Sequence, residues 1–395
     1  MSPQSPAASR SSRLPGLDAL RVLAILGVVS RHYPHTGAPA WFAEPTRFGW
    51  TGVDLFFVLS GFLIGRQLLE PIAAGERPHL SAFYLRRLFR ILPSYWVVLA
   101  LYALVPAVRG AESMAPLWKF LTFTQNIGFE GGPFGHAWSL CVEEQFYLVL
   151  PLLVLALAPR VGVRGVGLLS LGLIAAGVLL RSFAWESHLA SVPEGVPLNP
   201  IYWKWVYWPT WNRMDGLLAG VLLALVHVFR PAVWERWRRR PLGSGLLALV
   251  SLSLAWPLCA ENKTLLGCAV LFPLLAVGFG ALVVFAASHV GEQTLGRMPG
   301  ARWLASITYC VYLTHTFTKN LTLDAMEKLG WGPFHPATVL AYVGCLLAAS
   351  TLLHVAVERP SLRLRDYWMR SGEAYPPPRN DAERTPGRPP QATLP

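Results

Sequence analysis

The chain has 395 residues, of which 53% are hydrophobic and only 14% are charged. This composition is too apolar for an ordinary soluble domain and indicates a protein that faces lipid. The net charge of +12 does not indicate a nucleic-acid partner, because the Lys and Arg residues lie between hydrophobic runs and not on one exposed surface.

Ten segments are long and apolar enough to cross a hydrocarbon core of about 30 Å. They lie near 17–33, 50–69, 88–107, 138–158, 165–182, 208–229, 242–258, 266–288, 302–323 and 337–357. We therefore predict an all-α, polytopic transmembrane helix bundle of about ten spans. It occupies residues 14–370, between a cytoplasmic N-terminal tail at 1–13 and a Pro-rich, charged tail at 371–395 that we expect to be disordered.

The first expected span carries two ionisable residues, Arg21 and His32. Their spacing is close to three helical turns, so both lie on one face, about 16 Å apart along the axis. Charged groups inside membranes often mark functional sites, which favours a catalytic role for this pair. The alternative is structural, with Arg21 paired to Asp18 and His32 anchored at the membrane interface.

The second and third spans begin with polar residues. Asp54 opens the second span, and Arg86, Arg87 and Arg90 stand at the start of the third. The planar donor fork of arginine matches phosphate geometry, so the three arginines are candidates for binding a phosphate-bearing donor. Each one alone is also explained as a cytoplasmic membrane anchor.

The fourth span begins with two adjacent carboxylates, Glu143 and Glu144. Ser139, Glu143 and Tyr147 are spaced at i, i+4 and i+8, so they share one helix face. We expect Glu143 to orient or charge-stabilise the imidazole of His32 as a general base. The competing explanation is that acidic residues favour a helix N-terminus, which accounts better for one glutamate than for two.

The sixth and ninth spans supply further polar groups to the outer half of the bundle. Arg213 and Asp215 open the sixth, and Tyr312 and His315 lie within the ninth. We predict that they form one substrate pocket with Asp54 and Ser139. The five cysteines form no CxxC pair, so neither a metal site nor a disulfide framework is expected.

Lys and Arg residues are concentrated on alternate sides of the expected spans. If the N-terminus is cytoplasmic, the inner side receives most of them, including the cluster from Arg230 to Arg240. The positive-inside rule then predicts a multi-pass protein of the cell membrane with both termini in the cytoplasm.

Six segments, taken in order, resemble the membrane acyltransferase family 3, which includes O-acetylases of polysaccharides and lipopolysaccharide and O-acyltransferases of macrolides. They read LPGLDALRVLAILGVVSRH at 14–32, GVDLFFVLSGFLIG at 52–65, FYLRRLFRILPSYW at 83–96, HAWSLCVEEQFYLVLP at 136–151, RMDGLLAG at 213–220 and ITYCVYLTH at 307–315. Some members carry a further extracytoplasmic hydrolase-like domain that this sequence does not include, so peptidoglycan O-acetylation of the two-domain kind is not expected.

The resemblance implies an O-acyltransferase that moves an acyl group, with acetyl expected, from acyl-CoA to a hydroxyl of a carbohydrate or of a glycosylated or polyketide acceptor. It implies Arg21 and His32 as the paired functional residues of the first span, a functional pair in Arg87 and Arg90, and Glu143 as the glutamate of the fourth-span motif. No metal is expected. The alternative from another class is a proton-coupled transporter or flippase that uses the same His, Glu and Asp residues.

Overall fold

The structure is a computed structural model that describes residues 14–110, 113–128 and 131–370. Helices dominate this part of the chain, and it contains no β-strand. The expected tails at 1–13 and 371–395 lie outside the described residues. In chain order the helices are α1 (Pro15–His32), α2 (Ala40–Thr46), α3 (Gly52–Ala73), α4 (Leu80–Leu104), α5 (Pro106–Arg109), α6 (Leu117–Leu121), α7 (Trp138–His188), α8 (Leu198–Tyr202), α9 (Asp215–Phe229), α10 (Pro231–Arg238), α11 (Pro241–Ala260), α12 (Leu265–Ala286), α13 (His289–Thr294), α14 (Ala301–Glu327), α15 (Pro336–Leu353) and α16 (Arg359–Arg370).

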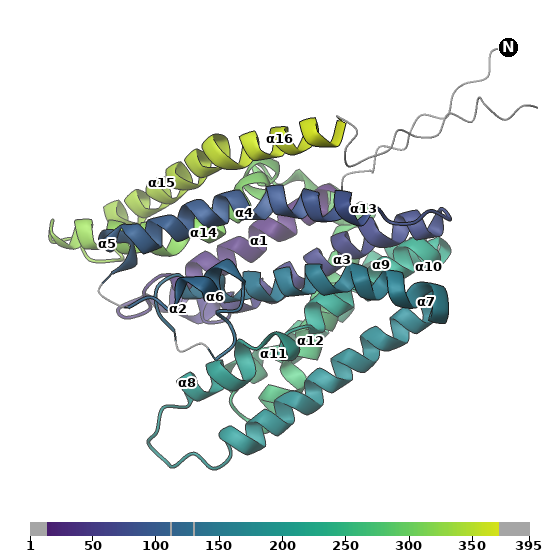
Figure 1. Ribbon diagram of the computed structural model, residues 1–395. Helices are drawn as coiled ribbons and strands as arrows, with labels where there is room; N and C mark the ends of the chain where they lie inside the picture. Colours follow the sequence, from purple (N-terminus) through teal and green to yellow (C-terminus); the bar gives the residue numbers. More distant parts are fainter. Residues whose placement is uncertain (1–13, 111–112, 129–130, 371–395) are drawn as a thin grey trace, which may run out of the picture.

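All ten expected spans fall on these helices. Two of them form a sharp hairpin within α7, which Figure 1 shows at one end of the bundle. The hairpin turns at Gly162, whose φ of 63° is a left-handed value that glycine adopts without a Cβ clash. The short helices α10 and α13 lie at the same end as this turn, and α2, α5 and α6 lie at the other (Figure 1).

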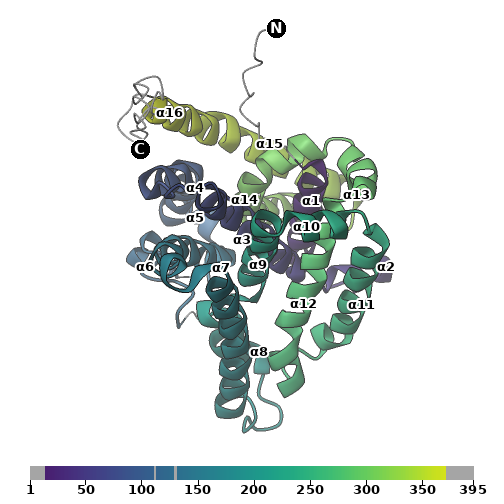
Figure 2. The ribbon, with the colours of Figure 1, turned by 90° about the vertical axis from the view of Figure 1, so that its right-hand side faces the viewer.

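Seven helical segments in the described residues are long and apolar enough to cross a membrane, or eight if the bent pair of α9 and α10 is one span. The all-α, polytopic character is thus confirmed. Neither α1 nor α14 belongs to the seven. Both helices carry more polar residues than the other expected spans. They pack against each other, and α3 and α12 also lie against α1 (Figure 2). Their polar side chains therefore face the protein interior more than lipid.

Two helix boundaries differ from the sequence expectation. Helix α4 begins at Leu80, so Arg86, Arg87 and Arg90 lie within its first three turns and not at its start. Helix α9 begins at Asp215, because Pro209 and a 3₁₀ turn at Thr210–Asn212 precede it. Hydrophobicity alone misplaced both starts, since charged residues extend one helix and apolar residues continue into the loop before the other.

Glycines bring α3 and α9 into close backbone contact. A Cβ built on Gly61 would lie 2.0 Å from the carbonyl oxygen of Leu217, and one on Gly220 would lie 2.4 Å from that of Val58. Small residues at such crossings let helix backbones approach closely inside a membrane. This contact fixes α3, which carries residues of both cavities described next.

Candidate active site

Two cavities lie toward opposite ends of α1 and α3. The first, about 680 Å³, is here named the arginine cavity; its lining includes Asp18, Arg21, Ser60, Arg86, Arg87, Arg90, Ser139, Glu143, Glu144, Tyr147, Tyr309, Tyr312 and His354. The second, about 530 Å³, is named the histidine cavity; its lining includes Arg31, His32, Arg47, Trp50, His136, Trp138, Tyr202, Tyr207, Trp208, Lys263 and Tyr312. The structure thus divides the expected single pocket into two.

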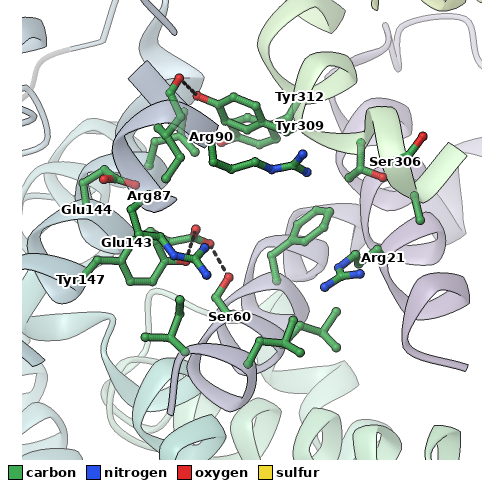
Figure 3. A pocket seen from close by; sticks show the side chains of 18 of the residues that line it. Arg21, Ser60, Arg87, Arg90, Glu143, Glu144, Tyr147, Ser306, Tyr309 and Tyr312 are labelled. Atoms are coloured by element: carbon green, nitrogen blue, oxygen red, sulfur yellow. Dashed lines mark hydrogen bonds between the residues drawn. The ribbon is translucent and has the colours of Figure 1, made fainter. Parts of the chain in front are cut away.

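Glu143 is a carboxylate of the arginine cavity that is held by two hydroxyl groups. It accepts hydrogen bonds from the Tyr147 hydroxyl at 2.8 Å and from the Ser60 hydroxyl at 3.3 Å. The guanidinium of Arg87 lies over the ring of Tyr147, 5.4 Å from its centroid. Figure 3 shows Arg21, Arg87 and Arg90 directed into the space beside this carboxylate. Ser139, Glu143 and Tyr147 share the cavity face, as their spacing predicted.

Arg90 forms an ion pair with Glu358, a fully buried residue that the sequence analysis missed. Glu358 also receives a 2.7 Å bond from Nδ1 of His354 and a 3.1 Å contact from the Cys310 thiol. Glu358 follows the last apolar run of the sequence, and nothing in that position predicts its ion pair with Arg90. Cys310, His354 and Glu358 have the spacing of a metal site among the described residues, but the guanidinium of Arg90 already supplies a positive charge there.

Arg21 lines the arginine cavity and donates to the carboxylate of Asp18 at 2.8 Å. The structure therefore contains the ion pair with Asp18 that was the structural alternative for Arg21. The Arg21 side chain remains 31% exposed, compared with 8% for Asp18. Its guanidinium can thus reach an anionic ligand in the cavity while it keeps its partner.

His32 stands in the wall of the histidine cavity with one ring nitrogen fixed. Its Nδ1 lies 2.8 Å from the carbonyl oxygen of Val28. Because a carbonyl only accepts, this contact places the proton on Nδ1 and leaves the Nε2 lone pair of the neutral ring available. An imidazole held in that tautomer can act as a general base toward a hydroxyl.

Two further imidazoles lie against His32. The ring centroid of His315 lies 4.8 Å from that of His32 and 4.7 Å from that of His136. The Thr316 hydroxyl lies 3.2 Å from both Nδ1 of His136 and Nε2 of His315. His315 is fully buried behind the cavity, so its expected place on the pocket surface is corrected. The sequence placed His136 at the start of the fourth span, but it did not predict the contacts of this residue with His315 and Thr316.

Glu143 and His32 do not form the contact that the sequence predicted. Each lines a different cavity, and the hydrogen bonds of Glu143 go to Ser60 and Tyr147. Spacing along α7 places Glu143 on one face of that helix but does not say which neighbour the face meets. In the structure this face is turned toward α3 and α4. The idea that Glu143 orients the His32 ring directly is therefore corrected.

Three other expected pocket residues are buried in ion pairs and line neither cavity. Asp54 binds Arg213 at 2.7 Å, and Asp215 binds Arg181 at 2.8 Å. The Arg213 guanidinium lies 4.3 Å from the ring centroid of Tyr207. Burying an ion pair is favourable only when further contacts satisfy both groups. Arg181 meets this condition, because it donates to both carboxylate oxygens of Asp215 and to the backbone carbonyls of Asn212 and Cys268. Asp54, Arg213 and Asp215 hold α3, α7, α9 and their neighbours together, and Arg181 was not identified from sequence.

Aromatic side chains form much of the histidine cavity. Apart from Tyr312, none of them was predicted from the sequence as part of a site, although the Trp-rich and Tyr-rich segment from Tyr202 to Trp211 was a visible signal. Flat aromatic faces beside polar groups suit a ligand with both apolar and hydroxyl-bearing faces. The aromatic lining consists of Phe48, Trp50, Trp138, Tyr202, Trp203, Tyr207, Trp208 and Tyr312.

A family model described as an acyltransferase domain matches residues 14–356. The peptidoglycan O-acetyltransferase OatA of Listeria monocytogenes is 27% identical over 336 residues, which cover 80% of this chain and 50% of that protein. YrhL of Bacillus subtilis, provisionally named a peptidoglycan O-acetyltransferase, is 28% identical over 373 residues, which cover 88% of this chain and 54% of that protein.

The chain spans about half the length of these curated relatives. No solved structure matches the chain. The comparisons give the transporter or flippase alternative no support, because the matching family and the relatives named above are acyltransferases.

Proposed function

This chain belongs to the acyltransferase family whose model covers residues 14–356, and it is an acyltransferase of the membrane O-acetyltransferase kind. We propose that it transfers an acyl group from acyl-CoA to a hydroxyl of a carbohydrate or of a glycosylated or polyketide acceptor. Acetyl is the proposed group. Peptidoglycan, the acceptor in the name of the Listeria relative, is one candidate carbohydrate.

The arginine cavity is the proposed donor site. Arg86, Arg87 and Arg90 lie on one wall and Arg21 on another, so several donor forks converge where the phosphates of CoA would bind. Arg90 would exchange part of its contact with Glu358 for a phosphate. The flexible arm of CoA would then carry the thioester toward Ser139 and Tyr312 at the inner end of the cavity.

The histidine cavity is the proposed acceptor site. In the proposed reaction the acceptor oxygen bonds to the acyl carbon, and the carbon–sulfur bond breaks. The hydroxyl proton passes to Nε2 of His32 and then to the CoA thiolate that leaves. The bond from Nδ1 of His32 to the Val28 carbonyl supports this role, because it fixes the required tautomer and disperses the positive charge that forms.

Two cavities that approach each other from opposite ends of the bundle are the observation that carries the proposal. One is rich in arginine and the other holds a histidine with an available lone pair. If the termini are cytoplasmic, as the arginine distribution predicts, the donor cavity faces the cytoplasm of a cell-membrane protein and the acceptor cavity faces outward.

The test is acyl transfer by the purified chain in lipid nanodiscs. Free CoA should appear from acetyl-CoA only when an acceptor is supplied, and mass spectrometry should find one acetyl group on an acceptor hydroxyl. Candidate acceptors are peptidoglycan fragments, neutral oligosaccharides and a glycosylated macrolide. Binding of acetyl-CoA without transfer to any of these would leave the donor assignment standing and overturn the proposed acceptors.

A further inference from the structure

The two cavities share a thin wall. Of all the residues that line them, only Val53 and Tyr312 belong to both. Each of the two is 6% exposed, so each is packed in the protein and shows a small surface to the cavities. Arg86, Arg87 and Arg90 lie on one side of this wall, and His32 lies on the other.

Hydrogen bonds fix the Tyr312 half of the wall. Its hydroxyl donates to the backbone carbonyl of His136 at 2.5 Å and lies 2.6 Å from the hydroxyl of Ser139. Because the Tyr312 proton goes to the carbonyl, Ser139 is the donor in the second bond. The phenol is thus held from two directions between α14 and the start of α7.

The packing of α3 against α1 fixes the Val53 half. A Cβ built on the preceding residue, Gly52, would lie 2.4 Å from the carbonyl oxygen of Ala24. Only glycine permits so close an approach, so the first turn of α3 has little freedom to move away from α1. Val53 therefore stands at a fixed place in the lining that it shares with Tyr312.

We propose that Val53 and Tyr312 form the constriction through which the acyl end of the donor thioester reaches His32, and that Val53 sets the acyl chain length that the protein transfers. This inference rests on the proposed function, in which the donor occupies the arginine cavity and the acceptor the histidine cavity. The donor phosphates stay on the arginine side, so the acyl group alone has to pass the wall.

A rigid constriction discriminates by size. One extra methylene in an apolar site changes discrimination by about 10-fold to 200-fold. A short acyl chain such as acetyl should pass the wild-type wall, whereas each added methylene should slow transfer. Because the discriminating step follows binding of the phosphates, the chain length should change the turnover rate more than the affinity for the donor.

The experiment compares acetyl-, propionyl- and butyryl-CoA with one acceptor in the wild type, Val53→Ala, Val53→Ile and Val98→Ala. Val98 is the matched control, because it is a buried valine of α4 that lines neither cavity. Val53→Ala should raise the ratio of butyryl to acetyl transfer by at least about 10-fold. Val53→Ile should lower the propionyl to acetyl ratio, and Val98→Ala should leave both ratios near those of the wild type.

Donor affinity is measured in parallel by calorimetry with each acyl-CoA. Affinities that barely change while the transfer ratios shift would support a constriction that acts after binding. Unchanged ratios in both Val53 variants, or an equal shift in Val98→Ala, would overturn the inference and leave the proposed function intact. Absence of transfer from every acyl-CoA to every acceptor would overturn the proposed function, and the inference with it.

Discussion

At the scale of single residues, the strongest prediction concerns His32. Replacing it with Gln keeps polarity and approximate size but removes a base that can accept a proton near neutral pH. General-base help contributes about 100-fold to 10,000-fold, so His32→Gln and His32→Ala should each lose at least about 100-fold in acyl transfer. Transfer rates are compared at equal amounts of membrane-inserted protein. That amount is measured by size-exclusion chromatography of the detergent-solubilised protein.

His35 provides the matched control for His32. It follows three residues later in the chain, outside the helix, and its Nε2 lies 3.0 Å from the Thr46 hydroxyl. Partial burial, with Arg31 and Arg47 nearby, lowers the pKa of His35. It lines neither cavity, so His35→Gln should retain transfer within a few-fold of the wild type. Normal transfer by His32→Gln would exclude His32 as base and leave His136 and His315 as the next candidates.

Arg87 and Arg90 should act on the donor more than on the chemical step. Replacing Arg87 with Ala removes a guanidinium that faces the arginine cavity, and should weaken acyl-CoA affinity with a smaller change in the maximal rate. Lys should restore only part of the affinity, because its ammonium lacks the planar fork. Affinity is measured by calorimetry with acetyl-CoA.

The exposed arginine Arg47 is the control for this series. It forms a loose 3.4 Å ion pair with Glu44 and belongs to the histidine cavity, so Arg47→Ala should leave donor affinity unchanged. Unaltered donor affinity in both Arg87→Ala and Arg90→Ala would remove the phosphate role and leave these arginines as membrane anchors.

At the scale of helices, the α3–α9 crossing should be the least tolerant of added volume. Gly61→Ala places a Cβ against the Leu217 carbonyl, which belongs to backbone and cannot rotate away. Overpacking of this kind costs about 1–3 kcal/mol or more, and here the backbones of two helices have to separate. Gly61→Ala should therefore lower the thermal unfolding temperature in detergent and reduce yield.

Gly172 is the control for the crossing. It lies in the second half of α7, and a Cβ there would meet nothing within 4 Å. Gly172→Ala should leave the unfolding temperature unchanged or raise it slightly, because alanine favours helix more than glycine does. Equal unfolding temperatures for the two variants would mean that α3 and α9 are not packed as described.

At the scale of the whole molecule, the arrangement of the described helices predicts which ends share a compartment. The turn of α7 at Gly162, the loop after α10 and the end of α16 should all face the cytoplasm. Reporter fusions after Arg240 and after Pro395 should both read cytoplasmic. A periplasmic signal at either position would reverse the donor and acceptor sides assigned to the two cavities.

Much of the molecule was predictable from the order of its residues. Apolar runs located ten segments that all fall on helices, because a bilayer imposes a similar length on every span. Helical spacing placed Ser139, Glu143 and Tyr147 on one face, and it placed Arg21 and His32 on one face of α1. The motifs pointed to an acyltransferase, which the family match confirms. These features depend on single helices, so no information about their neighbours was needed.

Partnership between helices was decided only by the tertiary structure. Spacing along a helix fixes which side chains share a face, but the neighbouring helix determines what that face contacts. Glu143 therefore binds Ser60 and not His32, and Asp54 neutralises Arg213 inside the bundle. Glu358 gave no sequence signal because its partner, Arg90, is distant in the chain. The division into two cavities follows from the same cause, since Val53 and Tyr312 reach their shared place between the cavities only when α3 and α14 pack against α1.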